Sequence, residues 1–394
     1  MAISLRKADA KRGGTRLSSR IDEYAAAFQL CLYCPSLCRH VCPVATADGS
    51  DSTSPWALMS LADHLRTQRL EVTAETVKAL SSCAGCGACQ AACLHDNPVS
   101  EALTEVRTAA VEAGLGPVPA SALARPPLPM DHPLFDALRA RSRFEERPVF
   151  SLVPGTATLL EAPEVVQSLI GVCERLEIDL LSCGDLARHD PGYDLWFAGH
   201  QREFVAQARA AHEATRGAQD IVVMSAETLY LLKHVYPRYG LSIDAELVHV
   251  SEFLLPILSG AVVKRRPGRV VYYESCILSR KLGLRDVPRQ VLRRVLAEPI
   301  IEMPARPEVT GCCGGSGIGI ACPETAERMA DAVVEAILGM GGAERPDLVV
   351  SFSPECVTAL RGAIARQGAR AAHLEIEHAV ALVAEAVVRD GAVA

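Results

Sequence analysis

The chain has 394 residues, of which 49% are hydrophobic and 22% are charged, a balance typical of a globular protein with roughly two to four domains. Its net charge of −7 and its aromatic content of 5% argue against a nucleic-acid binder, because such proteins usually present a basic face and aromatic platforms for bases. Fifteen cysteines are many for a chain too large to need disulfide staples. Clustered as they are, they indicate metal ligands or redox thiols.

Residues 1–20 form a basic arm that carries six Lys and Arg residues against one acidic residue (Arg6, Lys7, Lys11, Arg12, Arg16 and Arg20 against Asp9). A solvated, flexible arm is the favoured interpretation, and a docking segment for an acidic partner is the alternative. No signal peptide is expected, because the N-terminal segment lacks an apolar core, and the longest apolar stretches, such as 253–263, are shorter than the ~20 residues of a spanning helix. We therefore expect a cytoplasmic protein that would reach a membrane only through a partner.

Residues 21–115 predict a helical domain with two four-cysteine motifs. The second motif has the C-x2-C-x2-C-x3-C spacing of bacterial ferredoxins (Cys83, Cys86, Cys89 and Cys93). The first motif has one extra residue in its second gap but keeps the closing Cys-Pro (Cys31, Cys34, Cys38 and Cys42, followed by Pro43). The pattern predicts an α-helical two-cluster ferredoxin domain.

In such motifs three cysteines on a tight loop hold one cubane, and the fourth reaches the other cubane. The predicted ligands of cluster 1 are therefore Cys31, Cys34, Cys38 and Cys93, and those of cluster 2 are Cys83, Cys86, Cys89 and Cys42. Structural zinc is the alternative, but two matched runs of four cysteines do not follow the zinc-ribbon pattern. The predicted cofactors are two [4Fe–4S] clusters. The 40 residues between the motifs resemble the helical ferredoxin domain in iron–sulfur subunits of succinate dehydrogenase and fumarate reductase.

A proline-rich linker, 116–148, leads into an internal repeat formed by residues 149–262 and 268–394. Each half begins with an apolar strand (149–153 and 270–273), and a second apolar strand (221–224 and 348–350) runs into a helix (228–234 and 356–366). Alternating strands and helices predict parallel sheets. The expected fold is therefore α+β and multidomain, with the helical ferredoxin domain followed by two repeated α/β domains of mostly parallel strands.

Four cysteines of the second half, Cys276, Cys312, Cys313 and Cys356, fall at the ends of predicted strands. The carboxyl ends of parallel strands converge at one edge of a sheet, so these thiols are expected to meet there. In the first half the corresponding positions carry Thr156, Cys183 and Ser225-Ala226-Glu227-Thr228. One remaining thiolate cannot hold a cluster, so a metal site is expected in the second half alone.

This cysteine pattern resembles the CCG domain of the heterodisulfide reductase family, which carries a lone Cys, a Cys-Cys-Gly and a C-x-x-C. Here Ser353 replaces the first cysteine of the last element, either as a weak oxygen ligand or as a hydrogen-bond donor. The resemblance implies a third [4Fe–4S] cluster on Cys276, Cys312, Cys313 and Cys356, with zinc or no metal as alternatives. The whole chain resembles the D-type subunit of heterodisulfide reductase and the iron–sulfur subunits of glycolate oxidase and anaerobic glycerol-3-phosphate dehydrogenase.

The resemblance implies an iron–sulfur electron-transfer subunit that relays electrons between a flavin-dependent dehydrogenase partner and a membrane quinone or haem subunit, or another redox acceptor. The chemistry would then reside in the partner, and no catalytic residue is predicted here. A catalytic heterodisulfide reductase that uses the CCG-site cluster is the alternative, and the incomplete cysteine set counts against it. Of the histidines, His95 could tune a cluster or be an ordinary surface residue, whereas His249 and His373 are interpreted as equivalent structural positions of the repeat.

Overall fold

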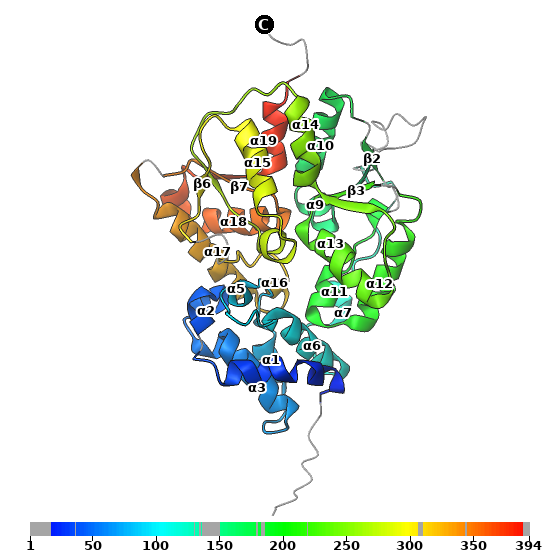
Figure 1. Cartoon of the computed structure of the whole chain (residues 1–394), viewed down its shortest axis with the longest axis vertical. Coiled ribbons are helices and arrows are strands. Elements are labelled where there is room, and N and C mark those ends of the chain that lie inside the picture. Colours follow the sequence, from blue (N-terminus) through cyan, green and yellow to red (C-terminus); the bar gives the residue numbers. More distant parts are fainter. Residues whose placement is uncertain are drawn as a thin grey trace, which may run out of the picture.

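The computed structural model describes residues 17–35, 37–129, 131–133, 135, 150–178, 180–182, 186–218, 220–305, 310–342 and 345–388. Figure 1 shows a helical N-terminal region, coloured blue to cyan, below two halves that each contain a sheet. Most of the basic arm (1–16), Cys183 of the first half and residues 136–148 of the linker lie outside the described residues.

The N-terminal region is built from six helices, α1 to α6 (Ala25–Leu32, Pro43–Asp48, Pro55–Arg66, Ala74–Leu80, Ala88–Ala91 and Val99–Glu112). Local chemistry sets where they begin: the hydroxyl of Ser54 accepts a hydrogen bond from the backbone N–H of Ala57, and Pro55 occupies the first turn of α3. Phe28 of α1, Met59 of α3 and Leu103 of α6 are fully buried in one shared core. This packing fixes the loops between the helices, which carry the cysteine motifs.

The described part of the linker includes a helical turn, α7 (Ala120–Leu123). After it, Arg125 forms an ion pair with Asp194 of the first half, with 3.0 Å between Nη2 and Oδ2. The described part of the linker is thereby attached to the first sheet unit.

The two halves contain four-stranded sheets of the same topology. Every strand pair is parallel, with the orders β2-β1-β3-β4 and β6-β5-β7-β8. The strands of the first sheet, β1 to β4, are Phe150–Val153, Leu180–Ser182, Asp220–Val223 and Glu246–His249, and those of the second, β5 to β8, are Val270–Tyr272, Ile301–Glu302, Leu348–Ser351 and Glu375–His378. The common order confirms the predicted repeat and the predicted fold class.

Helices cover both sheets and join the two halves (Figure 1). Those of the first half are α9 to α14 (Thr156–Glu161, Pro163–Arg175, Tyr193–Ala198, Gln201–Glu213, Ala226–Tyr230 and Val250–Gly260), and those of the second are α15 to α19 (Asp286–Val295, Ile318–Ala321, Pro323–Leu338, Pro354–Gln367 and Ala379–Ala386). Helix α10 packs on α19, and α14 packs on α15. Arg175 donates a hydrogen bond across this junction to the carbonyl oxygen of Ala384, at 2.6 Å. Among the described helices none is both long and apolar enough to cross a membrane.

The structure corrects one part of the repeat: the counterpart of His249 is His378, not His373. His249 and His378 each end the fourth strand of their sheet and cap the next helix, where Nδ1 accepts a hydrogen bond from the backbone N–H two residues later. Burial lowers the pKa of His249 to about 3 and that of His378 to about 4, so both are neutral acceptors at neutral pH. His373 lies before β8, on the exposed surface. The shared role is therefore structural.

Candidate iron–sulfur sites

The predicted cluster 2 cysteines line one cavity. Pro43 starts α2 immediately after Cys42, while Cys83 and Cys86 lie on the loop that leads into α5 and Cys89 lies in the first turn of α5. All four cysteines line one pocket. Cys42 therefore lies beside the second motif although it belongs to the first. Backbone N–H groups already face two of these sulfurs, from Gly85 to Cys83 at 3.4 Å and from Ala45 to Cys42 at 3.5 Å.

The predicted cluster 1 cysteines also lie together, with Cys93 of the second motif beside the first motif. Burial, with a smaller contribution from the nearby thiols of Cys38, Cys34 and Cys93, raises the pKa of Cys31 to about 11. Cys93 is thus close to the first motif. The side-chain amide of Asn97, itself buried, donates a hydrogen bond to Cys31 Sγ at 3.0 Å. Crowded thiols that oppose one another's ionisation need a cation to hold them as thiolates, and a metal cluster supplies it.

The four thiols of the CCG site (Cys276, Cys312, Cys313 and Cys356) are buried and adjacent. Cys276 Sγ lies 3.7 Å from Cys312 Sγ, and Cys313 Sγ lies 3.2 Å from Cys356 Sγ. The site lies where β5 and β7 end, with Cys312 and Cys313 supplied by the loop before α16. Among the described residues, no group of three or more His, Cys, Asp or Glu side chains is arranged to hold a single metal ion. A cubane differs from such an ion because it spreads its four thiolate ligands over four irons.

Backbone and hydroxyl groups surround the CCG thiols. The N–H groups of Gly314 and Gly315 point at Cys312 Sγ and Cys313 Sγ, at 3.5 and 3.4 Å. Such donors stabilise thiolate and sulfide charge. The hydroxyl of Ser353 accepts a hydrogen bond from the N–H of Cys356 at 3.3 Å and donates one to Glu355 at 2.9 Å. Ser353 therefore caps α18 in this structure, as Ser225 caps α13 in the first half.

The loop of cluster 2 touches the loop of the CCG site. The interaction of the Cys86 thiol with Cys312, together with the charges of Arg280 and Lys281, lowers the pKa of Cys86 below its usual value despite burial. The guanidinium of Arg280 donates to the carbonyl oxygen of Cys86 at 2.7 Å and to that of Thr310 at 3.0 Å. One side chain thereby binds both cysteine loops.

Phe197 of α11 fills the space beside that contact. A Cβ atom placed on Gly85, in the cluster 2 loop, would lie 2.9 Å from its ring, and one on Gly317, in the CCG loop, would lie 2.7 Å from it. The guanidinium of Arg107 stacks 4.1 Å from the ring centroid and donates to the Cys83 carbonyl oxygen at 3.4 Å. Both loops therefore approach the ring as closely as they do because they carry glycine at these positions.

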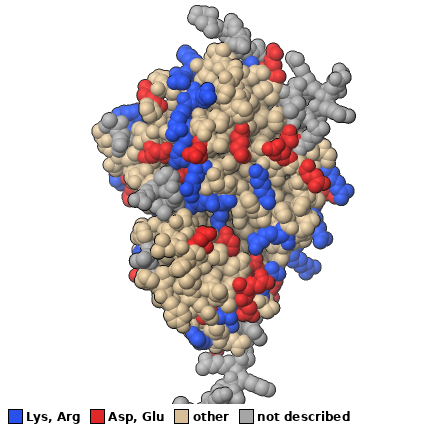
Figure 2. Space-filling model, viewed as in Figure 1, with Lys and Arg blue, Asp and Glu red and all other residues tan. Residues whose placement is uncertain are grey.

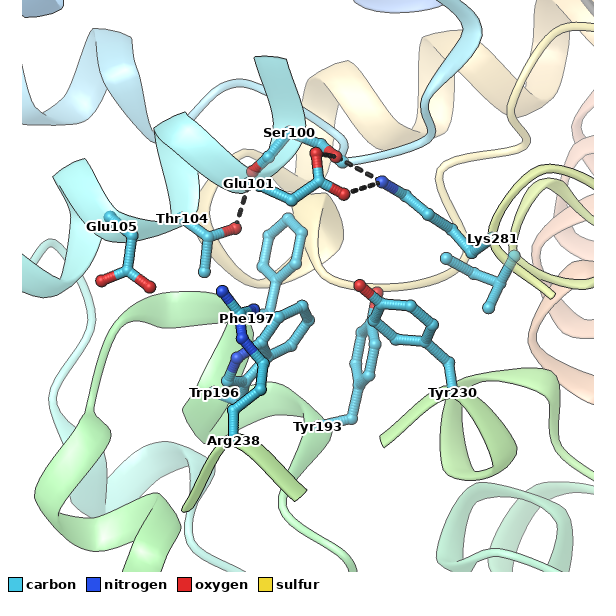
Figure 3. Close-up of a pocket in the computed structure, with 12 residues that line it drawn as sticks. Ser100, Glu101, Thr104, Glu105, Tyr193, Trp196, Phe197, Tyr230, Arg238 and Lys281 are labelled. Atoms are coloured by element: carbon cyan, nitrogen blue, oxygen red, sulfur yellow. Dashed lines mark hydrogen bonds and ion pairs between the residues drawn. The ribbon is translucent and has the colours of Figure 1, made fainter. Parts of the chain in front are cut away.

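Figure 3 shows the pocket where these parts meet, with Phe197 between the ferredoxin helix α6 and the aromatic side chains of the first half. The ammonium of Lys281 lies opposite the start of α6, 2.6 Å from Glu101 Oε1 and in hydrogen-bond contact with Ser100. This partly buried ion pair links the second half to the ferredoxin region. The three parts of the chain thus converge at the cysteine sites.

The predicted site residues that the structure describes fall into three groups, four cysteines to each. Sequence reasoning missed Asn97, Arg107, Arg280 and Lys281, which contact the cysteines or their loops. It considered His95, which is exposed, whereas Asn97 two residues later reaches Cys31. Only the position of Asn97 shortly after Cys93 could have suggested its role; nothing local marks the other three.

The fold and these thiol groups define an iron–sulfur protein. Residues 27–97 match the family described as a 4Fe-4S dicluster domain, and residues 270–361 match the family described as a cysteine-rich domain, CCG. The chain therefore contains a dicluster ferredoxin domain followed by a CCG domain, which confirms the resemblance and supports iron–sulfur clusters as the cofactors.

Three curated relatives are named as reductases or oxidoreductases, or as subunits of them. A subunit of the fumarate reductase (CoM/CoB) of Methanothermobacter marburgensis is 23% identical over 86% of this chain and 68% of its own length. A subunit of the dihydromethanophenazine:CoB--CoM heterodisulfide reductase of Methanosarcina acetivorans is 28% identical over 46% of this chain and 45% of its own. EtfAB:quinone oxidoreductase of Syntrophomonas wolfei is 28% identical over 43% of this chain and 24% of its own. The chain thus spans less than half the length of the last two relatives.

Proposed function

We propose that this chain is the electron-transfer subunit of an oxidoreductase complex and that it carries three [4Fe–4S] clusters. Cluster 1 is held by Cys31, Cys34, Cys38 and Cys93, cluster 2 by Cys83, Cys86, Cys89 and Cys42, and the third by Cys276, Cys312, Cys313 and Cys356. When bound, such clusters accept and release single electrons. The cysteine side chains would hold the three clusters one after another, and backbone N–H groups would surround them as hydrogen-bond donors.

The link between the loop of cluster 2 and the loop of the CCG site carries this proposal. Arg280 donates hydrogen bonds to the carbonyl oxygens of Cys86 and Thr310 and so fixes the two loops to each other. Cys42 and Cys93 similarly interlock the two ferredoxin motifs. These contacts support a continuous path from cluster 1 through cluster 2 to the CCG site.

The names of the relatives support a complex as the setting. Two of them include a second redox carrier, a quinone in one and dihydromethanophenazine in the other. We propose a flavin-dependent dehydrogenase at one end of the path and a membrane quinone or haem subunit, or another acceptor, at the other. The chain would work in the cytoplasm and reach the membrane through that partner.

Replacing Cys312 by alanine tests the proposed ligands of the third cluster. The variant should lose the CCG-site cluster and keep the two ferredoxin clusters, so the anaerobically purified protein should fall from about 12 to about 8 irons per chain. Iron analysis with EPR spectroscopy measures this change. Cys322→Ala is the matched control, because Cys322 belongs to none of the three groups. An unchanged iron content and an unchanged spectrum in Cys312→Ala would show that the third ligand set is wrong.

A cavity favours a second candidate, a catalytic disulfide reductase. An open pocket lies between the two halves, and it is bordered by Gly315 and Ser316 of the CCG loop and by Glu355, which precedes Cys356. Glu227 faces Glu355 from the first half, and burial together with the charge of Glu355 raises the pKa of Glu227 well above its usual value. Cleaving a disulfide consumes two electrons and two protons and releases two thiols.

The two candidates differ in what the isolated chain can do. A catalytic subunit, supplied with a low-potential donor, should reduce a heterodisulfide and release two thiols per two electrons consumed. An electron-transfer subunit should be reduced by the same donor without releasing thiols. We favour the second outcome, because the first half lacks the cysteines of a further cluster.

A further inference from the structure

Arg107 of α6 is a buried cation that forms no ion pair with a carboxylate among the described residues. It is only 3% exposed, and its nitrogen atoms contact neutral groups. Nη1 donates to the carbonyl oxygen of Cys83 at 3.4 Å and Nη2 to the hydroxyl of Thr104 at 2.9 Å, while Nε is buried without a hydrogen-bond partner. Because an arginine keeps its positive charge in a protein interior, this charge needs an opposite charge nearby.

The loop that Arg107 contacts supplies proposed ligands of cluster 2. Ligating cysteines are thiolates, and four thiolates carry more negative charge than an oxidised cubane carries positive charge, so the occupied site is anionic. The ring of Phe197 holds the guanidinium beside this loop, with Cζ of Arg107 4.1 Å from the ring centroid. The same ring packs against Gly85 of the loop. The opposite charge that Arg107 needs is therefore the one that this site acquires when it is occupied.

The cluster 2 pocket offers little other compensation for negative charge. Apart from the four cysteines, the residues that line it are neutral and mostly apolar, such as Val44, Leu58 and Val99. Each electron that a bound cluster accepts makes the site one charge more negative, and apolar surroundings oppose that change. An apolar pocket alone would therefore lower the reduction potential of cluster 2, and a buried positive charge beside the pocket would raise it again.

We propose that the guanidinium of Arg107 is the counter-charge of cluster 2 and that it raises the reduction potential of this cluster, so that cluster 2 can accept an electron from cluster 1. The step that Arg107 assists moves one electron from reduced cluster 1 to oxidised cluster 2, and no bond forms or breaks. The inference rests on the proposed function and names a residue that tunes the middle of the path. Arg107 acts through its charge, not as a cluster ligand.

Other basic side chains near cluster 2 differ from Arg107 because they border solvent. Figure 2 shows Lys and Arg side chains across the middle of one face of the molecule, and Arg280, Lys281 and Arg285 line an open groove beside the cluster 2 loop. Lys281 is largely neutralised by its ion pair with Glu101, at 2.6 Å. Water and salt weaken charges at an open groove, whereas they weaken a buried charge much less. The effect of Arg107 on cluster 2 should therefore persist at high salt.

Arg107→Met tests the proposal in the full, cluster-loaded chain, because it removes the charge and keeps an unbranched side chain. Redox titration followed by EPR measures the potential of cluster 2, whose signal is the one that Cys89→Ala removes. We expect a tenfold or greater loss of affinity for the electron, a fall of about 60 mV for a one-electron couple. The fall should be the same at low and high salt. Arg107→Lys keeps a positive charge and should restore most of the lost potential.

Arg20→Met is the matched control, since Arg20 also contacts α6 but pairs with Glu105 and Glu112 there, at 3.3 and 3.8 Å, and its side chain is 35% exposed. It should leave the potential of cluster 2 unchanged. Three results would overturn the proposal: an unchanged potential in Arg107→Met, the same lowered potential in Arg107→Lys, or loss of cluster 2 from both variants. Loss of cluster 2 from Arg107→Met alone would support it, because Arg107→Lys differs by keeping the charge. A wild type without cluster 2 would instead refute the proposed function.

Discussion

Replacing Cys42 by alanine is expected to abolish the cluster of the second motif, although Cys42 belongs to the first. The reason is its position: its thiol lines the cavity bordered by Cys83, Cys86 and Cys89. Cys93→Ala should in the same way abolish the cluster of the first motif, because Cys93 lies with Cys31, Cys34 and Cys38. Each variant should lose about four irons per chain and one EPR signal.

Two further variants identify which signal is lost. Cys89→Ala should remove the same signal as Cys42→Ala, and Cys38→Ala should remove the same signal as Cys93→Ala. Cys173→Ala is the control, because Cys173 is buried in α10 of the first half and belongs to no group. If Cys42→Ala instead matched Cys38→Ala, each motif would bind its own cluster and the crossover would be wrong.

Gly317→Ala should pull the CCG loop away from the cluster 2 loop. The backbone of Gly317 has a positive φ of 54°, and the added Cβ would lie 2.7 Å from the ring of Phe197. The ring is held by Arg107 on one face, so the loop rather than the ring must move. We expect a loss of about 1–3 kcal/mol in the free energy of unfolding, together with a weaker magnetic interaction between cluster 2 and the CCG-site cluster. Anaerobic denaturation and EPR of the reduced protein measure the two effects.

Gly283→Ala separates backbone strain from the steric clash. Gly283 also has a positive φ, 71°, but nothing lies within 4 Å of its added Cβ. It should lose about 1 kcal/mol and keep the magnetic interaction. Combining Gly317→Ala with Phe197→Ala should restore part of the interaction, since the ring is gone. A Gly317→Ala protein with the same EPR spectrum as the wild type would mean that Phe197 does not set the distance between the loops.

The cysteine groups were predictable from the sequence because motif spacing is local. Three closely spaced cysteines form one loop, and this geometry gives the sets for clusters 1 and 2 without any knowledge of the fold. The CCG set needed one further step, the convergence of parallel strands at one edge of a sheet. The repeated strand pattern supplied that step, and the two sheets have the same strand order.

The contacts between the three parts of the chain were not predictable. Arg280 binds the carbonyl oxygens of Cys86 and Thr310, and Phe197 packs on Gly85 and Gly317. These pairs are far apart in sequence and follow no spacing rule, because they form only where the folded ferredoxin region and the two sheet halves pack on one another. The prediction that His373 is the equivalent of His249 was wrong for a related reason. Strand pairing, rather than the mere presence of a histidine, defines the equivalent position, and it selects His378.

We propose that three interlocked groups of cysteines hold three clusters in one chain. Mössbauer spectroscopy of the anaerobically purified, iron-57-labelled protein, combined with iron and sulfide analysis, tests it most directly. The result expected is about 12 irons and about 12 sulfides per chain, all in cubane clusters. A colourless chain without iron, or about 8 irons accompanied by one zinc, would contradict it.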